Sequence, residues 1–220
     1  MHRAIIFDVD GTLLDTERIY MHAWQKAGAS FGYAIPREVL LQTRAVSSSV
    51  SESLFRRACG PDFPYSRIRA ERVIISEKII DSSPAHTLRM PYAQEILEWL
   101  KEQGYILAVA SSTDLSKTRA HLEHAGLLDF FSAIVGGDMV ENGKPQPDIF
   151  LEAAALCRVL PRHCLVVGDT PADVLGGTAA GMKVVLIPDQ VPLDSQTSSL
   201  SWKVLSGLEQ LKDTVARWEC

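Results

Sequence analysis

The chain has 220 residues, a formal net charge of −5 and 46% hydrophobic residues, an ordinary composition for a globular protein. The acidic balance and the lack of any lysine and arginine block argue against a nonspecific nucleic-acid binder. No apolar run is long enough to span a bilayer, no signal peptide precedes the first predicted strand, and the four cysteines match no zinc or disulfide pattern. We therefore expect a cytoplasmic protein with no nucleic-acid or membrane partner.

The N-terminal segment predicts a short buried strand that ends in a polar turn. Residues Ala4–Phe7 are apolar and lead into Asp8, Asp10 and the pair Gly11-Thr12. Alternate side chains of an extended backbone share one face, so we expect Asp8 and Asp10 to point to the same side. Two such carboxylates repel unless a cation binds them or one keeps its proton. The pair suggests chemistry, although for the pair alone a loop-capping role is the commoner explanation.

Helical patterns without a strand follow this turn and predict a separate domain. The four patterns are Arg18–Phe31, Pro36–Thr43, Val50–Ala58 and Arg67–Ile80. We expect this inserted helical domain to cover residues 16–84, because a Ser-Ser-Pro break marks its end.

From about Pro91 onward, strands and helices alternate. The expected strands are Ile106–Ala110, Ala133–Val135, Leu165–Val167, Val184–Ile187 and a short one at Lys203–Leu205. The expected helices are Tyr92–Glu102, Ser116–Ala125, Asp148–Arg158, Ala172–Ala180 and Leu208–Trp218. This alternation predicts an α/β fold in which residues 1–15 and 85–220 form a Rossmann-like core with a parallel sheet.

Polar side chains follow four of the predicted strands, at the edge where a parallel sheet binds ligands. In strand order they are Asp8 with Asp10, Ser111-Ser112-Thr113, Lys144 after a Gly-rich turn, and Asp169 with Asp173. Such a convergence is far less expected by chance than any one of these motifs.

These residue types fit phosphoryl transfer. A carboxylate such as Asp8 can attack phosphorus and form an aspartyl-phosphate, if a cation offsets the repulsion between the two anions. Mg²⁺ prefers oxygen ligands, which Asp8, Asp169 and a backbone carbonyl near Asp10 would provide. Lys144 and Ser111 would contact the phosphoryl oxygens. The Asp10 side chain, held away from the metal, would donate the proton that the leaving group needs.

In this order, the motifs resemble the haloacid dehalogenase-like phosphatase superfamily over the whole chain. The shared features are Asp-x-Asp-Gly-Thr near the N-terminus, a serine after the second strand, Gly143-Lys144-Pro145, the GDxxxD motif and a helical cap inserted after the first strand. The segments Leu14–Glu17 and Gly143–Asp148 are similar to the phosphoglycolate phosphatase and β-phosphoglucomutase branch.

The resemblance implies a role for each matching position. Asp8 would be the nucleophile and Asp10 the acid/base. The implied phosphate-binding residues are Ser111, Ser112, Lys144, Gly11 and Thr12. The implied Mg²⁺ site involves Asp8, Asp10 and Asp169, with Asp173 as a supporting residue behind the ligands.

Most of these residues also have an ordinary structural explanation. Lys144 fits an exposed loop lysine, and Ser111 fits a cap of the following helix. Asp169 with Thr170 fits the cap of the next helix, and Asp173 would favour the dipole of that helix. Their joint occurrence, in order, favours the catalytic interpretation.

Substrate choice is expected to lie in the inserted helices, which would close over the site and exclude water. The candidate specificity residues are Glu17, Tyr20, Arg44 and the loop Ala45–Ser49. Tyr20 stands where the β-phosphoglucomutase branch has a histidine. The segment Arg44-Ala45-Val46-Ser47-Ser48 replaces the Lys-Gly-Val-Ser-Arg pattern of that branch. Both departures favour hydrolysis over phosphate return to the substrate.

The leading hypothesis is a Mg²⁺-dependent phosphatase that acts on a small phosphorylated metabolite. A β-phosphoglucomutase-like mutase comes second, and a dehalogenase third because it needs neither Asp10 nor Asp169. A phospho-receiver or binding module is the non-enzyme alternative, but such domains are shorter and have no use for a helical insertion. The sequence leaves open the physiological substrate, the oligomeric state and the equilibrium between open and closed cap.

Overall fold

The computed structural model describes residues 3–44, 48–190 and 195–218, and the chain separates into two compact units. The first unit, the α/β unit, consists of Met1–Asp15 and Ala85–Cys220. The second, the helical unit, is Thr16–Pro84. Each unit has its own apolar core. Within the described residues, no helix is both long and apolar enough to traverse a membrane.

A six-stranded parallel sheet forms the centre of the α/β unit, in the order β3-β2-β1-β4-β5-β6. The strands are β1 Ala4–Phe7, β2 Ile106–Ala110, β3 Ala133–Val135, β4 Cys164–Gly168, β5 Lys183–Leu186 and β6 Lys203–Val204. The predicted α/β class with a parallel, Rossmann-like sheet is confirmed.

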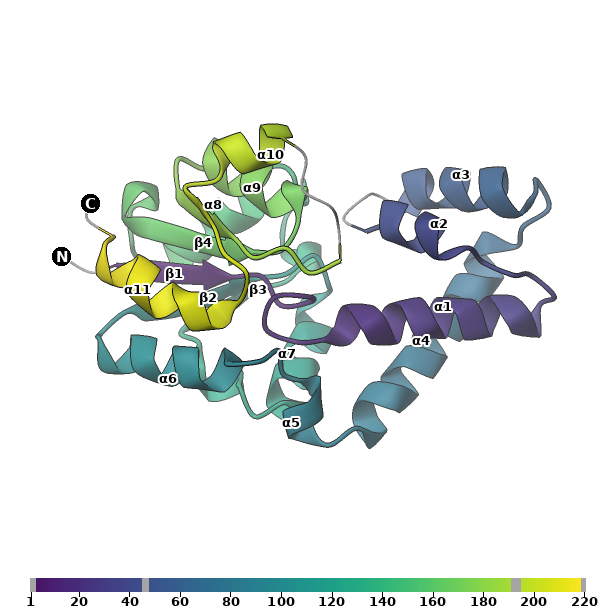
Figure 1. Cartoon of the computed structure of the whole chain (residues 1–220), viewed down its shortest axis with the longest axis horizontal. Helices are drawn as coiled ribbons and strands as arrows, with labels where there is room; N and C mark the ends of the chain where they lie inside the picture. The colour runs from purple at the N-terminus through teal and green to yellow at the C-terminus, as the bar shows by residue number, and fades with distance from the viewer. Residues whose placement is uncertain (1–2, 45–47, 191–194, 219–220) are drawn as a thin grey trace. The chain divides into compact units, whose positions relative to one another are not determined.

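Helices cover both faces of the sheet (Figure 1). The helices of this unit are α5 Ala85–Leu88, α6 Ala93–Glu102, α7 Leu115–His124, α8 Asp148–Leu156, α9 Pro171–Ala179, α10 Ser195–Leu200 and α11 Leu211–Ala216. Residues of α6, α7 and α11 share one apolar cluster with the sheet, and residues of α8 and α9 share the other.

The central strand β1 shows why the N-terminal segment is continuously apolar. Ile5 and Phe7 belong to the cluster on one face of the sheet, and Ala4 and Ile6 to the cluster on the other. All four side chains are fully buried. A strand covered on both faces has no solvent side, so alternation with polar residues disappears.

The helical unit contains α1 Thr16–Ser30, α2 Arg37–Gln42, α3 Ser48–Cys59 and α4 Tyr65–Ser82. Aromatic side chains from different segments hold it together. The ring of Phe55 on α3 lies 4.5 Å from that of Trp24 on α1 and 5.2 Å from that of Phe63, measured between centroids. This packing gives the unit a core independent of the sheet.

Some local predictions were wrong. The segment Leu208–Trp218 is a 3₁₀ turn, Leu208–Gln210, followed by the short helix α11. Ser48 and Ser49, expected in a polar loop or helix cap before a helix at Val50, already belong to α3, and residues 45–47 lie outside the described part of the chain.

Candidate active site

In the sheet, β1 lies between β2 and β4. The chain runs from β1 to β2 and β3 in one direction, then crosses back to β4 and continues to β5 and β6. A ligand site forms where the strand order reverses, outside the carboxyl ends of the strands. Asp8 directly follows β1 and Asp169 directly follows β4, so both lie at this point.

A tight turn after β1 gives the two N-terminal aspartates different surroundings. The Asp8 amide donates to the Val167 carbonyl at 2.9 Å, which extends the pairing with β4. Val9 points into the core, and Gly11 adopts a φ of 92°, a conformation that few other residues take. Asp8 is buried, whereas Asp10 is half-buried.

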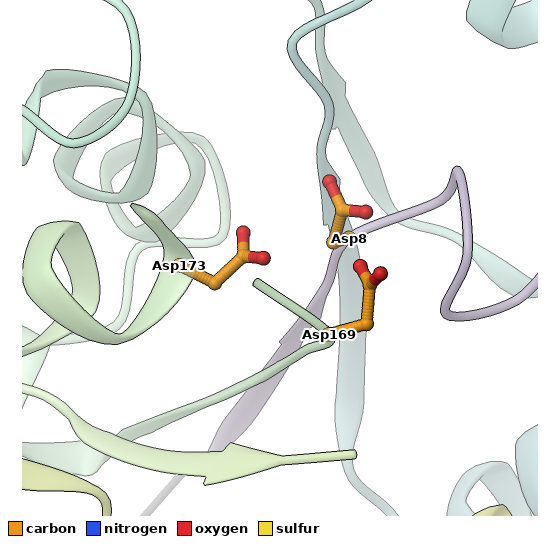
Figure 2. Close-up of side chains that lie close together, drawn as sticks. All are labelled: Asp8, Asp169 and Asp173. Carbon is orange, nitrogen blue, oxygen red and sulfur yellow. The ribbon is translucent and has the colours of Figure 1, made fainter. Parts of the chain in front are cut away.

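Three carboxylates gather at the strand ends, as Figure 2 shows. Asp8, Asp169 and Asp173 each offer an oxygen, and these oxygens lie within 4.8 Å of one another. All three residues are buried. Asp173 points toward the other two from the first turn of α9. The Asp10 carboxyl is not a member of this cluster.

Lys144 joins the cluster from the segment between β3 and α8. Its Nζ lies 2.5 Å from Asp8 Oδ1 and 2.6 Å from Asp173 Oδ1, and its side chain is 4% exposed. The alternative of an exposed loop lysine was therefore wrong. Lys144 is a buried cation held between two carboxylates.

Burial and neighbouring charges control the protonation of this cluster. Burial raises the pKa of Asp8 well above its usual value; Lys144 opposes this shift, and Asp173, Asp169 and Asp10 add to it. Burial by itself would lower the pKa of Lys144, but the charges and hydrogen bonds of Asp173 and Asp8 hold it above its ordinary value. Lys144 therefore stays charged, and its charge only partly offsets the effect of burial on the pKa of Asp8.

Hydroxyl groups fix two of the carboxylates. Asp173 Oδ2 accepts from the Thr170 hydroxyl at 2.6 Å and from the Thr170 amide at 3.1 Å, and Thr170 Oγ1 accepts from the Asp173 amide at 3.4 Å. This reciprocal cap begins α9. Thr12 Oγ1 donates to Asp169 Oδ1 at 3.3 Å. The cap thus involves Thr170 and Asp173, while Asp169 extends toward the cluster.

The loop after β2 contacts Asp10. Thr113 Oγ1 donates to Asp10 Oδ2 at 2.8 Å, and the Thr113 amide donates to Ser111 Oγ at 3.1 Å. The first amide of α7, that of Leu115, donates instead to Asp138 at 2.7 Å. Ser111 therefore does not cap the helix; its buried hydroxyl holds the loop that reaches Asp10.

The charge count indicates whether a cation fits this site. If all three carboxylates are ionised, they and the single ammonium leave two negative charges among buried side chains. A divalent cation with a preference for oxygen ligands matches this remainder in charge and chemistry. The residues therefore fit Mg²⁺.

Three specificity candidates, Glu17, Tyr20 and Arg44, lie in the helical unit, where each has a charged neighbour. Arg44 Nε lies 3.2 Å from Glu17 Oε2, and the Arg44 side chain is 4% exposed. Arg72 of α4 lies over the ring of Tyr20, with 4.0 Å between its Cζ and the ring centroid. Arg44 is a buried partner of Glu17, so an exposed helix-end arginine was the wrong alternative.

The structure brings together four of the residues that the sequence singled out, and adds one. Asp8, Lys144, Asp169 and Asp173 lie together. The sequence analysis placed Thr113 in the polar run after a strand but gave it no role of its own, and that run was the signal that marked it.

Three predicted phosphate-binding residues have other positions or contacts. The Gly11 amide donates to the Leu14 carbonyl at 2.8 Å and the Thr12 amide to the Val9 carbonyl at 3.2 Å, so both amides serve the turn. Ser112 is exposed. Phosphate binding by Gly11, Thr12 and Ser112 stays a prediction, as does metal binding through Asp10.

Comparison with known proteins gives a family match. Residues 5–187 match the family model described as haloacid dehalogenase-like hydrolase. The chain is 30% identical over 214 residues to a probable pseudouridine-5′-phosphatase of Drosophila melanogaster, covering 94% of this chain and 90% of that protein. It is also 30% identical over 213 residues to hexitol phosphatase A of Escherichia coli strain K12, covering 96% and 94%.

A solved structure shares the fold. The crystal structure of β-phosphoglucomutase from Clostridium difficile superposes with a TM-score of 0.81 at 23% sequence identity, covering 99% of this chain and 96% of that one. At this identity, the likeness describes the architecture alone.

Proposed function

This chain belongs to the haloacid dehalogenase-like hydrolases, and we propose that it is a Mg²⁺-dependent phosphatase of a small phosphomonoester. The predicted family is confirmed by the family match, and the similar proteins include phosphatases. One observation carries the proposal: a buried aspartate at the end of the central strand lies against a buried lysine, with a second strand-end aspartate beside it. We assign the first of these aspartates, Asp8, as the nucleophile that attacks phosphorus.

In the proposed first step, an Asp8 carboxylate oxygen attacks the phosphorus atom and the ester bond to the leaving oxygen breaks. The electron pair of that bond goes to the leaving oxygen, which takes a proton from the Asp10 carboxyl. Lys144, already 2.5 Å from Asp8, binds the phosphoryl oxygens as negative charge shifts onto them. The products are the free alcohol and an aspartyl-phosphate at Asp8.

In the second step, a water molecule attacks the phosphorus of the aspartyl-phosphate. Asp10, now deprotonated, accepts a proton from this water, and the bond between phosphorus and the Asp8 oxygen breaks. Inorganic phosphate leaves, and both aspartates return to their starting states. Asp10 thus acts in turn as acid and as base.

The cation would be held by Asp8 and Asp169, because Asp173 already binds Thr170 and Lys144 with its two oxygens. When bound, Mg²⁺ supplies the positive charge that lets two anions approach each other. Thr12 orients Asp169 toward this position. Asp173 would instead orient Lys144, which is a supporting role and not that of a direct ligand.

We assign substrate choice to the helical unit, where the Glu17–Arg44 ion pair and the stacked Tyr20–Arg72 pair offer charged and aromatic groups. Hydrolysis is favoured over a mutase reaction because Tyr20, covered by Arg72, stands where that branch has a histidine. A mutase would return the phosphate to the substrate and release little of it.

A screen of phosphorylated metabolites for phosphate release, with and without Mg²⁺, tests this function. We expect turnover of at least one small phosphomonoester in Mg²⁺ and none in its absence. The Asp8→Asn variant should be inactive, since an amide does not attack phosphorus. Activity that survives in this variant contradicts the assignment of the nucleophile, and turnover without a divalent cation contradicts the role of Asp169.

A further inference from the structure

We propose that Thr113 is a positioning residue for Asp10, and that its hydroxyl determines which carboxyl oxygen transfers the proton. The proposal rests on the proposed function, since it assigns a support to the acid/base group. The Thr113 hydroxyl donates to Asp10 Oδ2 at 2.8 Å across 103 positions of the sequence. Both residues are half-buried.

The backbone of Thr113 is held by three separate hydrogen bonds. Its amide donates to Ser111 Oγ at 3.1 Å. Its carbonyl accepts from the Gly137 amide at 3.0 Å and from the Thr118 hydroxyl at 3.2 Å. A side chain on a backbone fixed in this way has little freedom to leave Asp10.

The turn after β3 packs tightly against the Thr113 loop. A Cβ atom on Gly137 would lie 2.4 Å from the Ser112 carbonyl oxygen, so only glycine allows this approach. Asp138 binds the first amide of α7 from the same turn. The loop therefore has support from two neighbouring strands, β2 and β3, at the edge where Asp10 lies.

The contact has a chemical consequence for proton transfer. A carboxyl group has two oxygens that exchange by rotation, and a hydroxyl that donates to Oδ2 leaves Oδ1 to carry the proton. It also fixes the plane of the carboxyl group, which sets the direction of transfer. Loss of the hydroxyl should slow the steps that need this proton, and leave the attack of Asp8 unchanged.

Two substrates with different leaving groups separate these effects. The nitrophenolate of p-nitrophenyl phosphate leaves as a stabilised anion, whereas the alkoxide of glycerol 2-phosphate needs a proton. Thr113→Val removes the hydroxyl while keeping the shape, and Thr113→Ser retains it. Thr214→Val is the matched control, because it removes an α11 hydroxyl that donates to the Gln210 carbonyl, just before that helix, at 3.0 Å.

In Thr113→Val, we expect kcat for glycerol 2-phosphate to fall by about 100-fold with little change in KM. The burst of nitrophenol release should keep its wild-type rate, while steady-state turnover slows because hydrolysis of the aspartyl-phosphate also uses Asp10. Thr113→Ser and Thr214→Val should resemble the wild type. An equal loss in the glycerol 2-phosphate rate and in the nitrophenol burst would assign Thr113 to phosphoryl binding and overturn the proposal. Unchanged rates with both substrates would show that Thr113 has no role in proton transfer, and would also overturn it.

Crystal structures of the wild type and the Thr113→Val variant supply a readout that does not depend on turnover. We expect the Asp10 carboxyl to adopt another orientation, or several, once the hydroxyl is absent. An unchanged Asp10 overturns the proposal even if neither ester is a substrate. A wild-type protein that releases phosphate from no tested ester contradicts the proposed phosphatase instead, so the two failures are distinct.

Discussion

Lys144 compensates charge in a place that water hardly reaches. Its ammonium group contacts Asp8 and Asp173, and the Lys144 side chain is 4% exposed. The attraction is strong because the surroundings are poorly polarisable, and for the same reason either partner alone would be costly to bury. In the proposed mechanism, this same lysine also binds the phosphoryl group.

Replacement of this lysine by an apolar residue of similar length should reveal both roles. Lys144→Met leaves three buried carboxylates without a cation. We therefore expect a loss of about 3–5 kcal/mol in the free energy of unfolding without Mg²⁺. Added Mg²⁺ should recover part of this loss by binding the folded state. Urea unfolding with and without Mg²⁺ measures both the loss of stability and its recovery. The exposed Lys203→Met is the control, and equal stability of the two variants would contradict the account.

Individual site residues differ in how far the sequence predicts them. Asp8 and Asp169 directly follow strands, and strand ends are readable from apolar runs, so their meeting was predictable. The bond between Thr113 and Asp10 depends on side-chain direction in two loops, which no local pattern encodes. The burial of Lys144 likewise depends on partners distant in the chain.

At the scale of single elements, the start of α9 joins folding to the site. Thr170 and Asp173 cap each other, and the second oxygen of Asp173 holds Lys144. A helix start needs partners for its first amides, and here the capping carboxylate also serves the charge cluster. The position of Lys144 therefore depends on how α9 begins.

The variant Thr170→Ala tests this link. It removes a capping oxygen and a hydrogen bond to Asp173, so we expect a loss of about 1 kcal/mol in stability. Thr170→Ser keeps the hydroxyl and should retain most of that stability. Urea denaturation compares the three proteins. If the alanine and serine variants unfold at the same urea concentration, the Thr170 hydroxyl does not stabilise α9.

The elements were predictable where they are long or fully apolar. The strands at Ile106–Ala110 and Ala133–Val135 have the predicted bounds, because buried parallel strands are apolar throughout. The short helices α5 and α10, of four and six residues, were not predicted. Helices of this length have few turns in which an apolar period can show, although the six-residue α2 was predicted within Pro36–Thr43.

At the scale of the molecule, the chain folds around separate cores. The aromatic cluster of the helical unit shares no residue with the two clusters that cover the sheet. The chain passes between the units only near Asp15 and Pro84. Two cores joined by two connections should respond independently to damage in either one.

Hydrogen exchange of a core variant measures this independence. Phe55 is fully buried and stacked on Phe63, so Phe55→Ala should cost about 3–5 kcal/mol. We expect faster exchange in peptides from Thr16–Pro84 and unchanged exchange in β1 and β4. Val185→Ala, in the core of the sheet, should give the reverse pattern. Faster exchange throughout the chain in both variants would show a single cooperative unit.

The central claim is that Asp8 becomes phosphorylated during turnover, and trapping of the phosphorylated protein tests it most directly. The protein is mixed with Mg²⁺ and p-nitrophenyl phosphate, quenched in acid within the first turnover, digested and examined by mass spectrometry. We predict one phosphoryl group on the peptide that contains Asp8, lost on treatment with hydroxylamine and absent from Asp8→Asn. A phosphoryl group on another residue, or nitrophenol release at the wild-type rate by Asp8→Asn, would contradict the account.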